Sequence, residues 1–507
     1  MKLRMLPRRA ERPRRLATAV SLAVLASTAY LGCGARSSLL DASPSQALDA
    51  AANGEGLGSV EDAGAGGPAS DAGPVGPTGP TGPIDGSSEA GDAAGEDVDD
   101  ASTSASDLDT GPWPFDASCA DADLAIAAPN CGQCGAACEP GSVCTDGVCA
   151  APTSDWPLFG YDERHSGDNV AEVGVPPAID SWATTIAAGN ALSPATVESG
   201  RAVVTYESYF DQTTLLTAVD VSDGTHLWSY NFGSINQAGQ PSIVNGAVYV
   251  QTVGSAENSY LWSVAAATGN VTWSASFESQ WAYFWAPLVV GSNVFVNGGE
   301  YGGMYGFSAT DGAQIFFNDS LGQYDSWTPA YFGGDLYSFV AGSFCAESPT
   351  TGTVLATVTT PWNWDGYSMD TAPVFGASYG YVIAPPNLVA IDPATANVVW
   401  SVNGSYTGTP AVAGGVVYAI NGGHLVALDA TSGALLATMV GDGALSYPPI
   451  IASGFVYASS ASNVYAWSRT TYAQAWTAAA GGWISVAARR LLVAGTDGVL
   501  RGFVLSP

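Results

Sequence analysis

The chain has 507 residues, only 12% of them charged, and it is rich in glycine (61) and in aromatic residues (10%). This composition excludes a coiled coil or a helix-rich protein and is typical of a protein built from strands and turns. The net charge of −32 argues against nucleic acid as a partner, because phosphate binding needs clustered cations.

The first 32 residues have the pattern of an export signal. Seven of the 14 basic residues lie in the first 15 positions, and the apolar run LATAVSLAVLASTAYLG follows at 16–32. This run is too short and too rich in Ala and Ser for a membrane-spanning helix. We therefore predict a signal peptide over residues 1–32.

The cysteine that ends this run indicates a lipid anchor. Tyr30-Leu31-Gly32-Cys33 resembles the lipobox of bacterial lipoproteins, in which the cysteine becomes the lipidated N-terminus. The resemblance implies that Cys33 attaches the chain to a membrane. The expected location is the cell envelope, at the outer membrane or the cell surface. An unmodified cysteine after an ordinary signal peptide is the alternative.

Residues 33–118 are predicted to be a disordered acidic tether. From residue 34 on, this segment carries 16 acidic residues and one arginine, with much Ala, Gly, Ser and Pro. Such a segment buries too little apolar surface to offset the entropy lost on ordering. The stretch GPVGPTGPTGPI at 73–84 favours a short polyproline-II spacer over a collagen triple helix, which needs many more triplets.

Residues 119–150 form a cysteine-rich module. Six cysteines in an exported segment of this length favour three disulfides, although zinc binding by four thiolates is an alternative. Haem attachment at the CxxC is excluded because Gly135 stands where the histidine is required. The sequence leaves fifteen pairings open. The cysteines are Cys119, Cys131, Cys134, Cys138, Cys144 and Cys149.

From residue 151 to 507 one phrase recurs, as in LVALDATSG at 425–433 and LVAIDPATA at 388–396. The intervals between successive copies range from 36 to 45 residues. Each copy is preceded by two strand-like segments, and each of the first seven is followed by a turn and a last strand. A period near 40 with this pattern predicts an eight-bladed β-propeller with four antiparallel strands per blade. The copies begin at Leu216, Leu261, Met304, Phe344, Leu388, Leu425, Val464 and Leu500.

The eighth unit ends with its LVALD-type strand and lacks an outer strand. The segment SWATTIA at 181–187 is an outer strand without a blade of its own. We therefore predict that this N-terminal strand completes the last blade and closes the ring, which also removes exposed sheet edges.

The repeats resemble those of the PQQ-like (quinoprotein) propeller family. Most have a small residue, Asp or a substitute, Thr/Ser-Gly and then an aromatic residue, with Ala356 and Ala437 in place of the aromatic residue in two units. WPLFG at 156–160 with HSG at 165–167 also resembles the family's entry segment. The resemblance implies that the aromatic residue packs one blade against the next. The blade-docking residues are then Trp182, Trp228, Trp273, Trp400 and Trp476.

The family includes PQQ-dependent dehydrogenases and members without a cofactor. The dehydrogenases use an adjacent cysteine pair, a stacking Trp, calcium on carboxylate ligands and a catalytic Asp. This chain has no adjacent cysteines, and Cys345 stands alone among the repeats, where we expect it to be buried. Asp325, Asp365 and Asp370 are candidate carboxylates. We predict no cofactor, no metal site and no catalytic residue; PQQ with calcium in an oxidoreductase is the alternative.

Aromatic residues gather in the segments that precede the Pro-led inner strands, at one end of the predicted channel. Rigid aromatic rings with scattered carboxylates suit recognition of a glycan or a protein, although core packing is the alternative for each residue. The candidate ligand-binding residues are Trp281, Trp285, Tyr324, Asp325, Trp327, Trp362, Trp364, Asp365, Tyr447 and Trp483.

The sequence therefore predicts a lipid-anchored propeller that binds a partner at the cell envelope without catalysis. A PQQ-dependent dehydrogenase is one alternative. Another is an assembly factor for outer-membrane proteins, similar to the propeller lipoprotein of the β-barrel insertion machinery.

Overall fold

The computed structural model describes residues 143–145, 148–150, 154–206, 215–254, 258–280, 285–360 and 368–506, and these residues form strands, turns and loops but no helix. No helix that could span a membrane is therefore found in this part of the chain. The predicted signal peptide and tether, and the cysteine-rich module up to residue 142, lie outside the described residues. From that module the structure describes the hairpin of β1 (Val143–Thr145) and β2 (Val148–Ala150).

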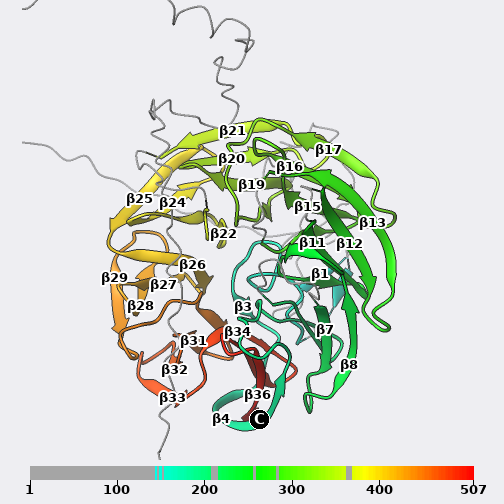
Figure 1. The fold of residues 1–507 in the computed structure, drawn as a ribbon. Coiled ribbons are helices and arrows are strands. Elements are labelled where there is room, and N and C mark those ends of the chain that lie inside the picture. Colours follow the sequence, from blue (N-terminus) through cyan, green and yellow to red (C-terminus); the bar gives the residue numbers. More distant parts are fainter. Residues whose placement is uncertain are drawn as a thin grey trace, which may run out of the picture. The chain divides into compact units, whose positions relative to one another are not determined.

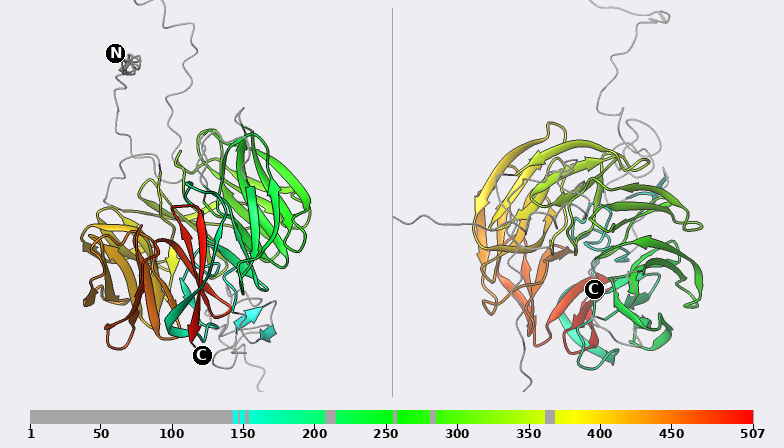
Figure 2. Two further views of the ribbon diagram at one scale, coloured as in Figure 1. Left: turned by 60° about the horizontal axis from the view of Figure 1, so that its bottom comes forward. Right: turned by 45° about the horizontal axis from the view of Figure 1, so that its top comes forward.

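Eight antiparallel sheets follow one another around a ring (Figure 1). Within seven of them each strand pairs with its sequence neighbour, from an inner strand at the centre to an outer strand at the rim. This arrangement confirms the predicted eight-bladed β-propeller. Figure 2 shows the same blades from two further directions.

The strands of each blade run from the inner to the outer edge. Blades 1 and 2 consist of β5 (Thr196–Glu198), β6 (Arg201–Val204), β7 (Leu215–Asp220) and β8 (His226–Asn231), then β10 (Ser242–Val244), β11 (Ala247–Gly254), β12 (Asn258–Ala265) and β13 (Val271–Glu278), with β9 (Ile235–Ala238) paired to β11. Blades 3 and 4 consist of β14 (Leu288–Val290), β15 (Asn293–Asn297), β16 (Met304–Ser308) and β17 (Gln314–Asn318), then β18 (Ala330–Phe332), β19 (Asp335–Val340), β20 (Ser343–Glu347) and β21 (Val354–Thr359). Blades 5 and 6 consist of β22 (Val374–Phe375), β23 (Gly380–Ala384), β24 (Asn387–Asp392) and β25 (Asn397–Asn403), then β26 (Tyr406–Ala413), β27 (Val416–Asn421), β28 (His424–Asp429) and β29 (Leu435–Met439). Blades 7 and 8 consist of β30 (Ile450–Ala452), β31 (Phe455–Ser459), β32 (Val464–Ser468) and β33 (Gln474–Ala478), with β3 (Asp168–Asn169) paired to β30, then β34 (Gly482–Ala487), β35 (Arg490–Gly495), β36 (Val499–Ser506) and β4 (Val175–Thr185).

The last blade is closed by a strand that precedes the first blade in the sequence. β4 pairs antiparallel with β36, and Trp182 lies opposite Gly502. This pairing confirms that an N-terminal strand supplies the outer strand of blade 8. The strand starts at Val175, earlier than the predicted residue 181, because it continues to pair with β36 as far as Ser506.

The recurring phrase forms the third strand of each blade. Packing explains why one of its residues is small, such as Ala218 in blade 1. In blade 1 Ala218 lies directly opposite Trp228, and a bulge follows that places Val219 opposite His226. The same shift between the third and fourth strands occurs in all eight blades. A β-carbon at Gly502 would lie 2.3 Å from the Trp182 ring, so a small residue leaves room for the aromatic ring.

The aromatic ring then packs on the turn of the next blade. The Trp228 indole nitrogen donates to the Ala266 carbonyl at 2.7 Å, and a β-carbon at Gly269 would lie 2.7 Å from the same ring. Trp182, Trp273 and Trp400 make the equivalent bond to Val221, Ala309 and Ala430 at 3.0, 3.0 and 3.1 Å. Each turn glycine has a positive φ and is in contact with the ring of the preceding blade. The pairs are Trp182 with Gly224, Trp228 with Gly269, Trp273 with Gly312, Phe316 with Gly352 and Trp400 with Gly433.

Two blades lack the large ring, and the next turn lacks the glycine. Ala356 precedes a turn with Ala396, and Ala437 precedes a turn with Tyr472. Both turn residues keep a positive φ, of 53° and 57°. The positive-φ turn is therefore kept in these blades as well. Glycine is found at this position only where an aromatic ring of the preceding blade contacts it. Trp476 of blade 7 meets Phe503 of blade 8 edge-to-face, with ring centroids 5.5 Å apart.

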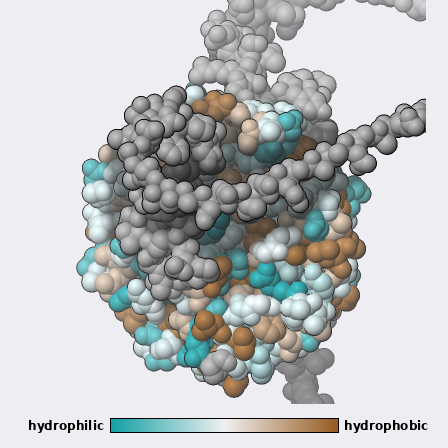
Figure 3. All heavy atoms as spheres, turned by 180° about the vertical axis from the view of Figure 1, so that it is seen from behind, coloured by the Kyte–Doolittle hydropathy of each residue, from teal (hydrophilic) through white to brown (hydrophobic). Residues whose placement is uncertain are grey.

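Outer strands expose apolar side chains singly. Leu355 is 56% exposed and Leu435 is 62% exposed, for example. On the face shown in Figure 3, hydrophobic and hydrophilic residues alternate over the coloured part of the surface. Scattered apolar residues of this kind are ordinary for a protein surface.

Candidate functional site

Residues 154–174, the entry segment, lie along the inner strands at the centre of the ring, where β3 is seen in Figure 1. An inner strand presents amide groups that no other strand of its own blade can pair. In six blades one residue of the inner strand donates its N–H to a carbonyl of this segment. The bonds are Val197 to Trp156 (2.7 Å), Ile243 to Pro157 (2.8 Å), Tyr331 to Glu163 (2.7 Å), Phe375 to Arg164 (2.9 Å), Val412 to Ser166 (2.8 Å) and Ile451 to Gly167 (2.7 Å).

Blade 8 is attached to the same segment by a side chain. The Asn169 amide donates to the carbonyls of Val486 and Asp155, at 2.7 and 3.0 Å. Asn169 is fully buried. One short segment thus connects the inner edges of seven blades by hydrogen bonds.

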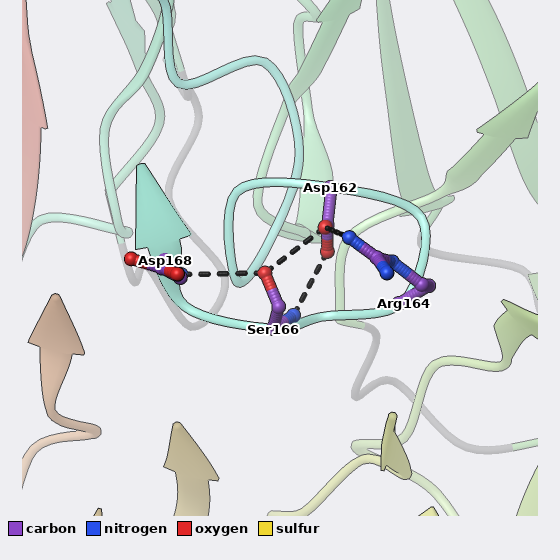
Figure 4. A network of polar contacts seen from close by, with 4 residues as sticks. All are labelled: Asp162, Arg164, Ser166 and Asp168. Carbon is purple, nitrogen blue, oxygen red and sulfur yellow. Dashed lines mark hydrogen bonds and ion pairs between the residues drawn. The ribbon is translucent and has the colours of Figure 1, made fainter. Parts of the chain in front are cut away.

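The turn in this segment is shaped by a polar network (Figure 4). The Asp162 carboxylate accepts bonds from the Ser166 N–H (2.8 Å), the Ser166 hydroxyl (2.9 Å) and the Arg164 guanidinium (2.9 Å). The Asp168 N–H donates to the Ser166 hydroxyl oxygen at 3.3 Å. Burial raises the pKa of the Asp168 carboxyl to about 6, against a lowering by the Arg469 charge.

His165 is held in one tautomer at the centre of the ring. Its Nδ1 lies 3.1 Å from the Pro373 carbonyl, which can only accept, so Nδ1 carries the proton and Nε2 carries the lone pair. The ring is 2% exposed, and burial lowers its pKa to about 4. His165 is therefore neutral at pH 7.

A small cavity of about 30 Å³ lies beside this histidine, at the end of the ring where the inner strands begin, here called the mouth. Its lining includes Trp156, Phe159, Trp483 and Gln240 as well as His165. Gln240 is 3% exposed, and neither atom of its amide has a hydrogen-bond partner among the described residues. The volume suits one or two water molecules or the tip of an inserted side chain.

Three of the predicted aromatic residues, Trp285, Tyr447 and Trp483, stand half-buried at the mouth. Trp285 stacks on Phe159 of the entry segment, with centroids 4.6 Å apart. Trp483 meets Tyr447 edge-to-face at 5.2 Å. Sequence reasoning missed the part played by Phe159 and Gln240, because their neighbours are distant in the sequence.

Other predicted site residues lie elsewhere. Trp327 is 1% exposed and donates to the Tyr324 carbonyl at 3.0 Å, so it belongs to the core, in agreement with the alternative given for each residue. Tyr324 packs against the same core. Four further predicted residues, Trp281, Trp362, Trp364 and Asp365, lie outside the described residues.

Asp325 is 5% exposed in the connection that leads into blade 4. Burial raises the pKa of its carboxyl, a hydrogen bond with Ser368 opposes the shift, and the Asp370 carboxylate adds to it. The backbone at Ser326 and Asp370 has positive φ, 55° and 47°. Non-glycine residues rarely adopt this conformation, so surrounding contacts hold it in place.

Cys345 departs from the sequence prediction. It is fully buried, as expected, but its sulfur belongs to a disulfide, so it does not stand alone. Its partner cysteine is not described. The predicted pairing of the six module cysteines with one another is not described either.

The described lining of the mouth does not suit PQQ. PQQ carries three carboxylates, whereas no arginine or lysine lines the cavity. Its volume is also far below the several hundred Å³ that hold a ligand of that size. No group of three or more His, Cys, Asp or Glu side chains that could hold a metal ion is found in the described residues. The absence of a cofactor remains a prediction.

The eight docked blades and their repeats define a PQQ-like β-propeller. The family model described as outer membrane protein assembly factor BamB matches residues 163–316 and 211–478, so the chain belongs to that family. No curated protein matches the chain in sequence.

Solved structures with the same fold have very different origins. BamB from Moraxella catarrhalis is 16% identical, with a TM-score of 0.52 over 65% of this chain and 100% of that one. The quinohemoprotein alcohol dehydrogenase ADHIIG from Pseudomonas putida HK5 is 13% identical, with a TM-score of 0.53 over 69% of this chain and 80% of that one. The computationally designed Ika8 protein is 12% identical, with a TM-score of 0.52 over 64% and 100%. An assembly factor, an enzyme and a designed protein share this fold, so the fold does not select the function.

Proposed function

We propose that the chain is a non-catalytic scaffold of the cell envelope that binds a protein partner at the mouth of the propeller. The observation that carries this proposal is the composition of the mouth: aromatic rings around a small cavity whose described lining holds a neutral histidine and an amide but no charged group. Rigid aromatic rings beside a pocket are typical of binding hot spots. A cluster of His, Cys, Asp or Glu side chains that could hold a catalytic metal ion is not found among the described residues.

The location rests on the sequence and on the family. A signal peptide over 1–32, lipidation at Cys33 and an acidic tether over 33–118 would place the propeller at a distance from the membrane. The family model is described by a factor that assembles outer-membrane proteins. That description favours, as the narrower candidate, a role in outer-membrane protein assembly.

Photo-crosslinking tests the partner site. A photoreactive phenylalanine analogue would replace Trp285 or Trp483 at the mouth, and Leu355 on an outer strand as the matched control. We expect both mouth positions to form one discrete adduct with an envelope protein, while the control forms none. The same adduct at Leu355, or none at the mouth, would contradict the proposal. An adduct with a component of the β-barrel insertion machinery would support the narrower candidate.

A cofactor titration tests the alternative. The mature chain would be titrated with PQQ and calcium while Trp fluorescence is followed, with dye-linked alcohol oxidation measured on the same sample. We expect no saturable quenching up to high micromolar PQQ. Saturable quenching with turnover would replace the scaffold by an oxidoreductase.

A further inference from the structure

A second concave site lies between blades 8 and 1, at the end of the ring opposite the mouth. It is a groove of about 370 Å³, within the range of small-ligand sites. The turn between β5 and β6, the turn between β7 and β8, and the turn between β34 and β35 form its walls. The lining residues are Ser199, Gly200, Arg201, Asp220, Val221, Ser222, Leu227, Ala488 and Arg490.

Two arginines dominate the charge of this groove. Among the described residues Arg164 and Arg501 form ion pairs, with Asp162 and Asp497, whereas Arg201 and Arg490 form none. Arg490 donates only to carbonyls, those of Ser222 and Arg489, both at 3.3 Å, and its Nε is buried without a partner in the same part of the chain.

The one carboxylate in the lining is already occupied. Asp220 accepts bonds from the N–H and the hydroxyl of Ser222, at 2.7 and 2.5 Å, and these bonds close its own turn. Two guanidinium groups therefore face one partly satisfied carboxylate. In a chain of net charge −32 this local excess of positive charge is unusual.

The groove also has an apolar wall. The bulge in β8 leaves Leu227 without a partner in the strand register, and its side chain is 41% exposed. Val221 also lines the groove but is only 1% exposed, so Leu227 supplies most of the apolar surface. A ligand that satisfied both features would carry an anionic group for the arginines and a small apolar group for Leu227.

We propose that this groove binds a carboxylate attached to an apolar group, as found at the C-terminus of a peptide. Arginine guanidinium groups bind carboxylates through paired, charge-assisted hydrogen bonds, and Arg201 and Arg490 provide the donors. Leu227 contacts the neighbouring apolar side chain. This site is separate from the partner site proposed at the mouth and does not depend on it.

Calorimetric titration of the mature chain with acetyl-Ala-Leu tests the proposal, with acetyl-Ala-Leu amide as the probe that lacks the charge. We expect the acid to bind about tenfold or more tightly than the amide, and less tightly at high salt. Arg201→Gln and Arg490→Gln should each weaken binding of the acid about tenfold. Arg501→Gln removes one positive charge outside the groove and should leave binding unchanged.

A third probe separates the sources of the carboxylate. Acetyl-Glu amide offers a side-chain carboxylate without a free C-terminus. Saturable binding of either acid supports the site, and the tighter probe identifies its source. Equal binding of acid and amide, an equal loss in Arg501→Gln, or no binding of either acid would overturn it. Circular dichroism would show that each variant keeps the strand content of the parent chain.

Discussion

Three exposed turn carboxylates and the buried Asp325 differ in how the fold treats their charge. At the turns after the recurring phrase, Asp223, Asp311 and Asp429 are exposed, and hydrogen bonds from backbone N–H groups and from Ser or Thr hydroxyls lower their pKa values. At the mouth, Asp325 is buried and its pKa is raised. The turns therefore need their charge for local structure, whereas the mouth retains a carboxyl that burial disfavours as an ion.

The same contrast appears in the repetition itself. Turn glycines recur because an aromatic ring of the preceding blade contacts them, and they are replaced where that ring is absent, at Ala396 and Tyr472. The mouth connections share little beyond the proline. Repetition is thus retained where blades dock on one another, and the connections vary where a partner could bind.

The substitution with the largest expected effect disrupts one docking contact between blades. Gly269→Ala would place a β-carbon 2.7 Å from the Trp228 ring at a positive φ, and we expect a loss of about 3 kcal/mol in the free energy of unfolding. Gly246→Ala is the matched control, because that glycine of the same blade has φ 76° and no atom within 4 Å of the added carbon. It should cost only about 1 kcal/mol. Equal losses in urea unfolding would contradict the packing explanation.

A missing docking contact should also be restorable. Ala356→Trp alone should be destabilising, because the new ring meets the β-carbon of Ala396. Combined with Ala396→Gly, the pair should show a favourable coupling of about 2 kcal/mol in a double-mutant cycle. Additive effects would mean that ring and glycine do not act as a unit.

One buried carboxyl interrupts the pattern of the third strands. Glu347 is fully buried, whereas the equivalent residue in blade 6 is Leu428, and only one of its carboxyl oxygens has a partner, the Ser338 hydroxyl at 2.5 Å. Burial raises the pKa of Glu347 well above its usual range. The folded protein then holds a proton that the unfolded chain releases above pH 4.5, so stability falls as the pH rises.

Glu347→Gln and Glu347→Leu should both remove this dependence. Between pH 5 and 6 the free energy of unfolding of the parent chain should fall by about 1.4 kcal/mol relative to that of either variant. Urea unfolding at the two pH values gives the difference. Parallel profiles for parent and variants would show that Glu347 is ionised in the fold.

The substitutions with the smallest expected effect replace one turn carboxylate, Asp429, and the buried carboxyl Asp325 near the mouth. The lowered pKa of Asp429 stabilises the fold above the usual pKa of the group, so this contribution disappears on acidification, and Asp429→Asn should abolish it. The raised pKa of Asp325 acts in the other direction, so Asp325→Asn should reduce the loss of stability at higher pH. The difference in melting temperature between each variant and the parent chain should change with pH between 3 and 8. The slope of this difference should have opposite signs for the two variants. Slopes of the same sign would remove the contrast between the two carboxylates.

The blades were predictable because their spacing is local and repeated. A phrase every 36 to 45 residues defines the four-stranded unit, and the unpaired strand at 181–187 predicts the closure of the ring. The path of the entry segment was not predictable, because its hydrogen bonds join residues 156–169 to positions throughout the ring. The groove was missed for the same reason: Arg201 and Arg490 become neighbours only when the first and last blades meet.

Closure of the ring by β4 also has a consequence for the order of events during synthesis and folding. β4 is made before the other three strands of its blade, whereas its partner β36 is the last strand of the ring to be made. Until then β4 has no partner strand, while all the other blades are synthesised. Pairings of such long sequence separation form slowly, and open strands aggregate. A chaperone that holds the unpaired strand is therefore a natural requirement of this topology.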